Sequence, residues 1–443
     1  MTTSTRPRVL LIWPYGIQGA ESIPMFASFL QPQLRPIADV GMFDCSLFGV
    51  SPRSQAFREA VTHAFDNNTA PPDVIGISSW SQNWRWVGIT IDALREFLPD
   101  VPIVLGGPHV TATNDTGRAD YALTGEAEYT FPQLVSALAR GAPASEIEQI
   151  QGLRRFGQTV TTKQALVQDL DALGLPNFDA MLLRLYQEKT YRYRNGTQRQ
   201  APVLATRGCP YECAFCEAPM LSGRKIRKHS AAYLRELLLN LRGQYDVTHV
   251  NIVDDNFSFY PKYAIEFCEM VLAEPKLKGM TFATPNGLRV ERSNPEMFRA
   301  MKAAGWSRVI FAPESGSQRM VDIMAKHLDL GVIPGRVQMA HDAGLEVEAF
   351  FIMNYPGETN ADVDQTADFI ASNNFDEISL HIFKPLPHTP IWRELVEIGR
   401  LAPDYVVGRY DEVDWLANGR SQSEIEMMVL KYRYSAKSVF RVA

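Results

Sequence analysis

The sequence predicts an α/β protein with two successive parallel-sheet regions: an open, doubly wound sheet followed by a partial (β/α)6 barrel. Short β-branched runs alternate with amphipathic helical runs in two separate stretches, which is the pattern of parallel α/β folds. A length of 443 residues corresponds to two or three domains at roughly 150 residues each. We therefore expect a first domain at 1–140, a connector with hairpins at 141–200, the barrel at 201–390 and a C-terminal helical extension at 391–443.

Composition and charge argue against several classes of protein. Hydrophobic residues make up 46% and charged residues 21%, as in globular rather than disordered chains. No apolar run approaches the roughly 18 residues of a membrane helix, and Val9–Trp13 is too short for a secretory signal. A net charge of −6 offers no electrostatic footprint for nucleic acid. We expect a cytoplasmic protein with neither a membrane nor a nucleic-acid partner.

In the first region, expected strands alternate with expected helices. The strands are 8–13, 41–45, 73–78, 101–105 and 119–123, and the clearest helices are 53–66, 85–98 and 128–140. Ligands of doubly wound sheets bind beyond the carboxyl ends of the strands. Small residues there allow close approach of a ligand, although tight βα turns explain the glycines as well. The candidates are Tyr15, Ser78, Ser79, Trp80, Gly106, Gly107, Pro108, His109, Gly125 and Glu126.

The connector has little α/β character. Residues 152–163 and 191–200 are typical of hairpins, and the second turns at Asn195-Gly196.

The second region repeats the strand–helix alternation six times. Expected strands are 202–206, 248–253, 280–284, 307–312, 346–353 and 377–383, and expected helices are 230–242, 261–273, 295–304, 332–343 and 362–372. In a parallel barrel, reactive groups lie at the carboxyl ends of the strands. Beyond it, apolar residues from Ile425 to Phe440 recur at helical spacing.

Three of the five cysteines crowd into eight positions directly after the first barrel strand. Cys209, Cys213 and Cys216 form a C-x3-C-x2-C pattern. A structural zinc ion would need four ligands, with His229 as the candidate for the fourth. A 4Fe–4S cluster is usually held by four thiolates, so three would leave one iron open for another ligand. Cys45 and Cys268 are expected to be ordinary buried thiols.

This loop resembles the cluster motif of the radical S-adenosylmethionine (SAM) enzymes. The order TRGCPYECAFC, DDNF, APESGSQ, NYPGET and KPLPHTP is similar to the subgroup with an N-terminal cobalamin-binding domain. The pieces VIGISS, VLGGPH and LTGEAE resemble that first domain, so the likeness spans roughly residues 8–390. It implies a Rossmann- or flavodoxin-like first domain and a TIM-like barrel.

The resemblance implies roles for the residues at the barrel strand ends. Cys209, Cys213 and Cys216 would ligate the cluster, and the open iron would take the amino and carboxylate groups of SAM. The implied SAM contacts are Phe215, Asp254, Asp255, Asn256, Arg289, Glu314, Ser315, Asn354, Pro356 and Gly357. Among these, Phe215 could instead fill the core of its own loop, Asp255 or Asn256 could cap a helix, and Arg289 could form a surface salt bridge.

The resemblance also implies cobalamin at the first sheet. Neither His63 nor His109 lies in the D-x-H-x-x-G motif that supplies cobalt with a histidine, a motif that the subgroup also generally lacks. Trp80 would then lie over the lower face of cobalt, with ordinary packing as the alternative.

The activity implied is radical chemistry on an unactivated carbon of a small molecule, with methyl transfer through methylcobalamin. A flavodoxin- or ferredoxin-type reductant would supply electrons. A non-methylating ring rearrangement, cyclisation or oxidation needs the same cofactor sites, and a cobalamin- or zinc-binding sensor is the non-enzymatic alternative. Tyr15, Trp306, His381 and His388 are candidate walls of the substrate space.

Overall fold

The computed structural model describes residues 6–14, 24–65, 71–157, 162–187, 199–408, 417–435 and 439–442. The chain divides into two compact units. Unit 1 comprises residues 1–189, 220–223 and 396–409, and unit 2 comprises 190–219, 224–395 and 410–443. No described helix is both long and apolar enough to cross a bilayer.

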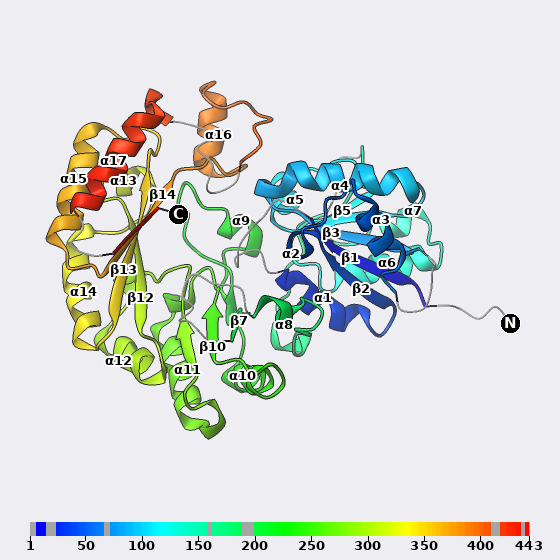
Figure 1. The fold of residues 1–443 in the computed structure, drawn as a ribbon, viewed down its shortest axis with the longest axis horizontal. Coiled ribbons are helices and arrows are strands. Elements are labelled where there is room, and N and C mark those ends of the chain that lie inside the picture. Colours follow the sequence, from blue (N-terminus) through cyan, green and yellow to red (C-terminus); the bar gives the residue numbers. More distant parts are fainter. Residues whose placement is uncertain are drawn as a thin grey trace. The chain divides into compact units, whose positions relative to one another are not determined.

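Unit 1 is built on a six-stranded sheet with the order β2-β1-β3-β4-β5-β6 (Figure 1). Neighbouring strands are parallel except for the antiparallel pair β5 and β6. The strands are β1 Arg8–Trp13, β2 Asp39–Asp44, β3 Val74–Ser78, β4 Ile103–Gly106, β5 Tyr121–Leu123 and β6 Leu153–Arg155. The order confirms the doubly wound sheet.

The two faces of this sheet carry separate cores, because side chains alternate along each strand. Val9 and Leu11 of β1 belong to one core, and Leu10 and Ile12 belong to the other. The helices of unit 1 are α1 Met25–Leu34, α2 Cys45–Phe48, α3 Gln55–Thr62, α4 Trp84–Phe97, α5 Pro108–Thr113, α6 Thr130–Ala139, α7 Ala144–Ile147 and α8 Leu183–Tyr186.

The connector differs from the expectation. Leu153–Arg155 pairs with β5 and extends the sheet, whereas the far half of the hairpin expected at 152–163 lies mostly outside the described residues. Backbone hydrogen bonds decide this, because the free edge of β5 offers the partners that the strand needs. The expected hairpin turn at Asn195-Gly196 lies outside the described residues, and Gln200 begins the first strand of unit 2.

Unit 2 is a partial parallel barrel, as predicted. Its strands are β7 Gln200–Val203, β10 His249–Ile252, β11 Thr281–Ala283, β12 Arg308–Glu314, β13 Glu346–Met353, β14 Glu377–Ile382 and β15 Val439–Val442. They form the sheets β7-β10-β11 and β12-β13-β14-β15, with all neighbours parallel. Parallel bridges Phe282–Trp306 and Leu288–Phe311 lie between the two sheets.

Helices follow the barrel strands. They are α10 Ala231–Tyr245, α11 Pro261–Ala273, α12 Pro295–Ala304, α13 Gln318–Ile323, α14 Ile333–Asp342, α15 Asn360–Ser372 and α16 Pro390–Glu397. Trp306 stacks on Phe282 and contacts Phe257 and Phe267, with 1% of its surface exposed. The prediction that Trp306 lines a substrate space is therefore wrong, because the ring fills the core.

The tail is not wholly helical. Helix α17, Gln422–Ser435, packs against α15 and buries Ile425, Met428 and Tyr432, as the apolar spacing predicts. Val439 and Phe440 lie instead on β15, which pairs with β14 (Figure 1). The helical expectation is wrong there, because the exposed edge of β14 gives the last residues a strand partner.

Candidate functional site

The cysteine loop follows the short strand β8, Thr206–Arg207, which pairs with β9, Arg227–Lys228. All three thiols are free, and burial raises the pKa of Cys209 and Cys216, the latter to about 12. Asp255 and Cys213 raise the pKa of both thiols further, and Cys209 also raises that of Cys216. Burial thus disfavours the thiolate form of Cys209 and Cys216, a cost that bound iron would offset.

Hydrogen bonds from distant segments fix the loop. The Ala214 N–H donates to the Met324 carbonyl at 2.8 Å, and the Ile391 N–H donates to the Ala214 carbonyl at 3.0 Å. Just before the loop, the buried Asp254 carboxylate accepts from Ala205 N at 2.7 Å and from Thr206 N and Oγ1 at 2.8 Å each. Asp254 thus anchors the start of the loop, a role that its sequence position alone did not indicate.

Beside the cysteines, two buried oxygens have no hydrogen-bond partner among the described residues: Asn256 Oδ1 and Glu217 Oε1. The Asn256 Nδ2 group points to Cys209 Sγ at 3.8 Å. Burial raises the pKa of Glu217 to about 7. Asp255 is exposed, and its charge acts on the thiols. Unpaired buried acceptors are costly, so this position suits a ligand with a donor group such as the SAM amine.

Two neighbouring strands end in left-handed backbone at non-glycine residues. Glu314 ends β12 with a φ of 67°, and Asn354 follows β13 with a φ of 58°. Such conformations cost on the order of 1 kcal/mol or more and concentrate at functional sites. Both residues belong to the set predicted from the sequence.

The structure adds Lys326 to this site. Its ammonium lies 2.6 Å from Glu314 Oε1 and 5.9 Å from the centre of the Phe215 ring, and the residue is 8% exposed. Burial opposes the charge, but Glu314 and Cys213 raise the pKa of Lys326 above its usual value. Its neighbours Ala325 and His327 have positive φ. No motif marked this lysine, because only the fold brings it to Glu314.

Arg289 is held inside unit 2. Its Nε lies 2.6 Å from Glu291 Oε1, its Nη2 donates to the Lys326 carbonyl at 2.8 Å, and its guanidinium stacks 3.6 Å from the centre of the Tyr211 ring. Tyr211 lies between Cys209 and Cys213. The salt bridge expected as the alternative role of Arg289 therefore forms, but inside unit 2 rather than at the surface. Through Tyr211, Arg289 also supports the cysteine loop.

The remaining predicted barrel residues contact other parts of unit 2, including residues 417–418 of the tail. Ser315 Oγ lies 3.2 Å from Thr366 Oγ1, and Phe215 meets Tyr355 edge to face at 6.4 Å. The Asn354 amide faces Ala417, and the Gly357 N–H donates to Asn418 Oδ1 at 2.8 Å. Pro356 is buried between them in the chain. Sequence analysis missed this contact between the β13 loop and residues 417–420.

In unit 1, the predicted residues that the structure describes lie at the carboxyl ends of the adjacent strands β3, β4 and β5. Ser79 Oγ donates to the Gly106 carbonyl at 2.8 Å, next to Ser78. A Cβ on Gly107, whose φ is 96°, would lie 2.6 Å from Ser79 O, whereas a Cβ on Gly106 would meet nothing within 4 Å. This edge therefore combines tight strand packing with open space beside Gly106.

The other residues of this edge pack within unit 1. His109 follows Pro108, stacks on Trp84 at 4.0 Å and lies 3.0 Å from Ser81 Oγ, which holds its imidazole inside the unit. Trp80 meets Trp13 edge to face at 6.4 Å. Gly125 and Glu126 contact the connector, since Glu126 N–H donates to Ala165 O at 2.8 Å. Tyr15 lies outside the described residues.

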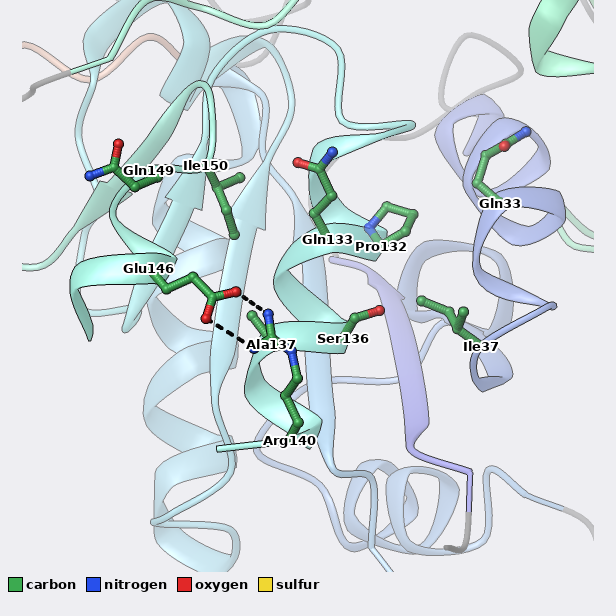
Figure 2. Close-up of a pocket in the computed structure, with 10 residues that line it drawn as sticks. All are labelled: Gln33, Ile37, Pro132, Gln133, Ser136, Ala137, Arg140, Glu146, Gln149 and Ile150. Carbon is green, nitrogen blue, oxygen red and sulfur yellow. Dashed lines mark hydrogen bonds and ion pairs between the residues drawn. The ribbon is translucent and has the colours of Figure 1, made fainter. Parts of the chain in front are cut away.

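A separate groove of about 480 Å³ lies between α1, α6 and α7 (Figure 2). The ion pair of Arg140 and Glu146 lies along it, with one N–O distance of 2.9 Å. The groove is lined by residues along α6, from Pro132 to Ala137, and by Gln33 near the end of α1. It contains none of the residues that the sequence singled out.

The donor set suits a cluster better than a single ion. Among the described residues, no three His, Cys, Asp or Glu side chains gather closely enough to hold one metal ion. A 4Fe–4S cluster does not need such a group, because each thiolate binds a different iron. His229, the candidate fourth zinc ligand, stacks on Tyr233 at 3.9 Å.

Comparison with known proteins agrees with this geometry. Residues 203–370 match the Radical SAM superfamily, and residues 42–135 match the B12 binding domain. The chain is 28% identical over 329 residues to an uncharacterized methyltransferase of Pyrococcus horikoshii, covering 72% of this chain and 69% of that protein. It is 26% identical to an anaerobic magnesium-protoporphyrin IX monomethyl ester cyclase of Rubrivivax gelatinosus, covering 88% and 70% respectively.

A solved structure shares the fold. The radical SAM methyltransferase TsrM of Kitasatospora setae, with cobalamin and a 4Fe–4S cluster bound, gives a TM-score of 0.75 at 15% identity, covering 98% of this chain and 89% of that one. The chain belongs to the radical SAM enzymes that carry a B12-binding domain. Its cofactors are accordingly a 4Fe–4S cluster, SAM and cobalamin.

Proposed function

We propose that this enzyme methylates an unactivated carbon of a small-molecule substrate. When bound, the cluster and SAM supply a 5′-deoxyadenosyl radical, and cobalamin supplies the methyl group. The observation that carries the proposal is the hydrogen-bonded loop with three free thiols at the barrel, in a chain related to a methyltransferase.

Different residues of unit 2 bind the cluster and the separate parts of SAM. Cys209, Cys213 and Cys216 hold the cluster. Asn256 Oδ1 and the exposed Asp255 carboxylate accept from the SAM amine, since the first is a buried acceptor without a partner among the described residues. Glu314 accepts from the ribose hydroxyls, with its carboxylate held in place by the Lys326 ammonium. Phe215, Ser315, Asn354, Pro356 and Gly357 shape the adenosine side.

The residues of unit 1 bind cobalamin at the carboxyl edge of the sheet. Gly106 leaves room for the corrin, because even a Cβ added at this position would have no other heavy atom within 4 Å. Ser78, Ser79, Gly107 and Gly125 hold the strand ends in register around it. His109 does not ligate cobalt, since Trp84 and Ser81 hold its ring.

A second candidate function is a non-methylating cyclisation or oxidation with the same cofactors. The specific observation in its favour is the relationship to the Rubrivivax cyclase, which extends over 88% of this chain. Both functions need the same cofactor residues, so the products must distinguish them.

The cluster is tested by single Cys→Ala variants at positions 209, 213 and 216 after anaerobic reconstitution. Each is expected to lose most of its iron and to cleave no SAM under dithionite. The matched control is Cys268→Ala, which removes another buried free thiol of unit 2 and should keep its iron. Zinc without iron in the wild-type protein would favour the sensor alternative instead.

Methyl transfer is tested by counting co-products with candidate substrates. We expect S-adenosylhomocysteine and 5′-deoxyadenosine in about equal amounts, because one SAM supplies the radical and a second restores the methyl group. Substrate-dependent 5′-deoxyadenosine without S-adenosylhomocysteine would overturn methylation and favour the cyclase-like reaction. A flavodoxin or ferredoxin should replace dithionite as the electron source.

A further inference from the structure

We propose that a row of three aromatic side chains flanked by two exposed basic side chains on unit 2 is the docking surface for an acidic, one-electron carrier protein. The row, here called the basic–aromatic strip, consists of Lys228, Tyr260, Phe259, Tyr211 and Arg292. This inference rests on the proposed function, because a one-electron carrier is useful only to a protein that holds a cluster.

The strip is continuous. The Lys228 ammonium lies 5.8 Å from the centre of the Tyr260 ring, and Tyr260 meets Phe259 edge to face at 4.7 Å. Phe259 in turn meets Tyr211 at 5.9 Å. The Arg292 guanidinium lies 4.7 Å from the Phe259 ring, and its Nε is 3.4 Å from the Tyr211 hydroxyl. The strip therefore runs without a gap from β9 to the cysteine loop.

The cations of the strip are accessible and held in place. Lys228 and Arg292 are exposed, and Tyr260 is 47% exposed. Cation–π contacts hold both charges over rings while leaving them in solvent, so little side-chain entropy is lost when a partner binds. Lys262, also exposed, follows Tyr260 by two positions and adds a third positive charge.

The acidic residues around the strip are mostly paired internally. Glu291 lies 2.6 Å from Arg289, and Glu212 forms an ion pair with Arg224. Asp255 is exposed within the cysteine site and contributes one opposing charge. Lys228, Lys262 and Arg292 thus place three exposed positive charges against the negative charge of Asp255, in a chain whose net charge is −6. This arrangement would attract a negatively charged partner.

The position of the strip indicates why the partner should be an electron carrier. Tyr211 belongs to the strip and to the loop between Cys209 and Cys213, so a protein seated on the strip would lie next to the cluster. Redox partners meet through small, transient interfaces guided by complementary charge. The transfer balances as one electron: the flavin or iron–sulfur centre of the carrier is oxidised, and the cluster is reduced.

The test compares a charge-reversed strip, Lys228→Glu/Arg292→Glu, with a control pair, Lys278→Glu/Arg299→Glu. The control residues are exposed on unit 2 outside the strip, and both pairs change the net charge equally. A purified flavodoxin is the probe. We measure its dissociation constant by calorimetry at low and high salt, and the rate at which its reduced form reduces the cluster.

We expect the strip variant to weaken flavodoxin binding at least tenfold at low salt, to lose most of the salt dependence and to slow cluster reduction similarly. Wild-type iron content and dithionite-driven SAM cleavage would show that the variant is intact. Unchanged binding, or an equal loss in the control pair, would overturn the docking site. If wild-type protein cleaves no SAM even with dithionite, the proposed function fails instead, whatever the strip binds.

Discussion

At the scale of single residues, the site is arranged around a buried ion pair that no motif marked. Glu314 and Lys326 are each 8% exposed, and their charged atoms lie 2.6 Å apart. A buried charge is tolerated only with a partner, because leaving water costs several kcal/mol per ion. The pair therefore holds the Glu314 carboxylate in place at a position with left-handed backbone, where it can accept hydrogen bonds from a ligand.

This pairing predicts strong coupling between the two residues. Glu314→Gln should lower the free energy of unfolding by about 3 kcal/mol, because it leaves the Lys326 ammonium buried without its partner. The double variant Glu314→Gln/Lys326→Met should cost less than the sum of the single variants. Urea unfolding of four cluster-free proteins (wild type, the two single variants and the double variant) completes this double-mutant cycle.

An exposed pair provides the comparison for this cycle. Lys431 and Asp364 form an ion pair at the surface, with 46% and 60% of their side chains exposed. Lys431→Met should change stability by less than about 1 kcal/mol. Strictly additive effects at Glu314 and Lys326 would contradict the view that the pair is a coupled unit.

At the scale of elements, the loop after β13 depends on a distant part of the chain. The Arg420 guanidinium lies 2.9 Å from Glu358 Oε2 and donates to the Glu358 carbonyl at 3.1 Å. Asn418 donates to the Tyr355 carbonyl at 2.8 Å. The segment before α17 therefore satisfies the polar groups of a loop that would otherwise bury them unpaired. The tail is a structural part of the barrel rather than an appendage.

The buried Glu358 predicts a pH dependence of stability. Burial raises its pKa to about 7, although Arg420 opposes the shift, against an unfolded value near 4.5. The folded state thus binds more protons than the unfolded state between these values, so stability falls as pH rises from about 4.5 to 7. Asp362 is held below its usual pKa and titrates below this window.

Glu358→Gln should remove on the order of 2–3 kcal/mol of the stability difference between pH 5 and pH 8. Urea unfolding at both values measures it, and the exposed Glu426→Gln on α17 is the control. Subtracting the variant from wild type cancels other titrating groups, including His249, whose pKa burial lowers to about 4. An identical pH slope in wild type and Glu358→Gln would refute the assignment.

At the scale of the whole molecule, the chain forms two compact units, each with its own core. Unit 1 has hydrophobic cores on both faces of its sheet, and unit 2 is centred on the barrel and its aromatic cluster around Trp306. The units are interleaved in sequence, because residues 220–223 and 396–409 return to unit 1. Each unit holds one of the two proposed sets of cofactor residues.

Two units with separate cores should respond separately to their cofactors. Added cobalamin at about 100 times its dissociation constant should stabilise unit 1 by about 2.7 kcal/mol, and SAM should stabilise cluster-loaded unit 2 in the same way. Anaerobic calorimetry should therefore show two transitions, each shifted by one ligand. A single transition raised equally by both ligands would mean that the units unfold as one.

Much of the fold and part of the site could be predicted because their signals are local. The alternation of β-branched runs with amphipathic helical runs predicted β1, β13, α11 and α12 with the bounds that the structure has. Helix α13 and strand β15 were missed, since one is short and the other needs the edge of β14 as a partner. Hydrogen bonding to a strand that is distant in the sequence cannot be predicted from local composition.

The sequence by itself determined the order of two α/β regions, the cysteine triplet and the strand ends that carry the candidate ligands. These features depend on spacing along the chain, which the sequence records directly. Only the tertiary structure decided that Asp254 anchors the loop, that Lys326 meets Glu314, and that Arg420 supports Glu358. Those roles depend on burial and on contacts between distant residues, and in each case the cost of an unpaired buried charge or polar group specifies the partner.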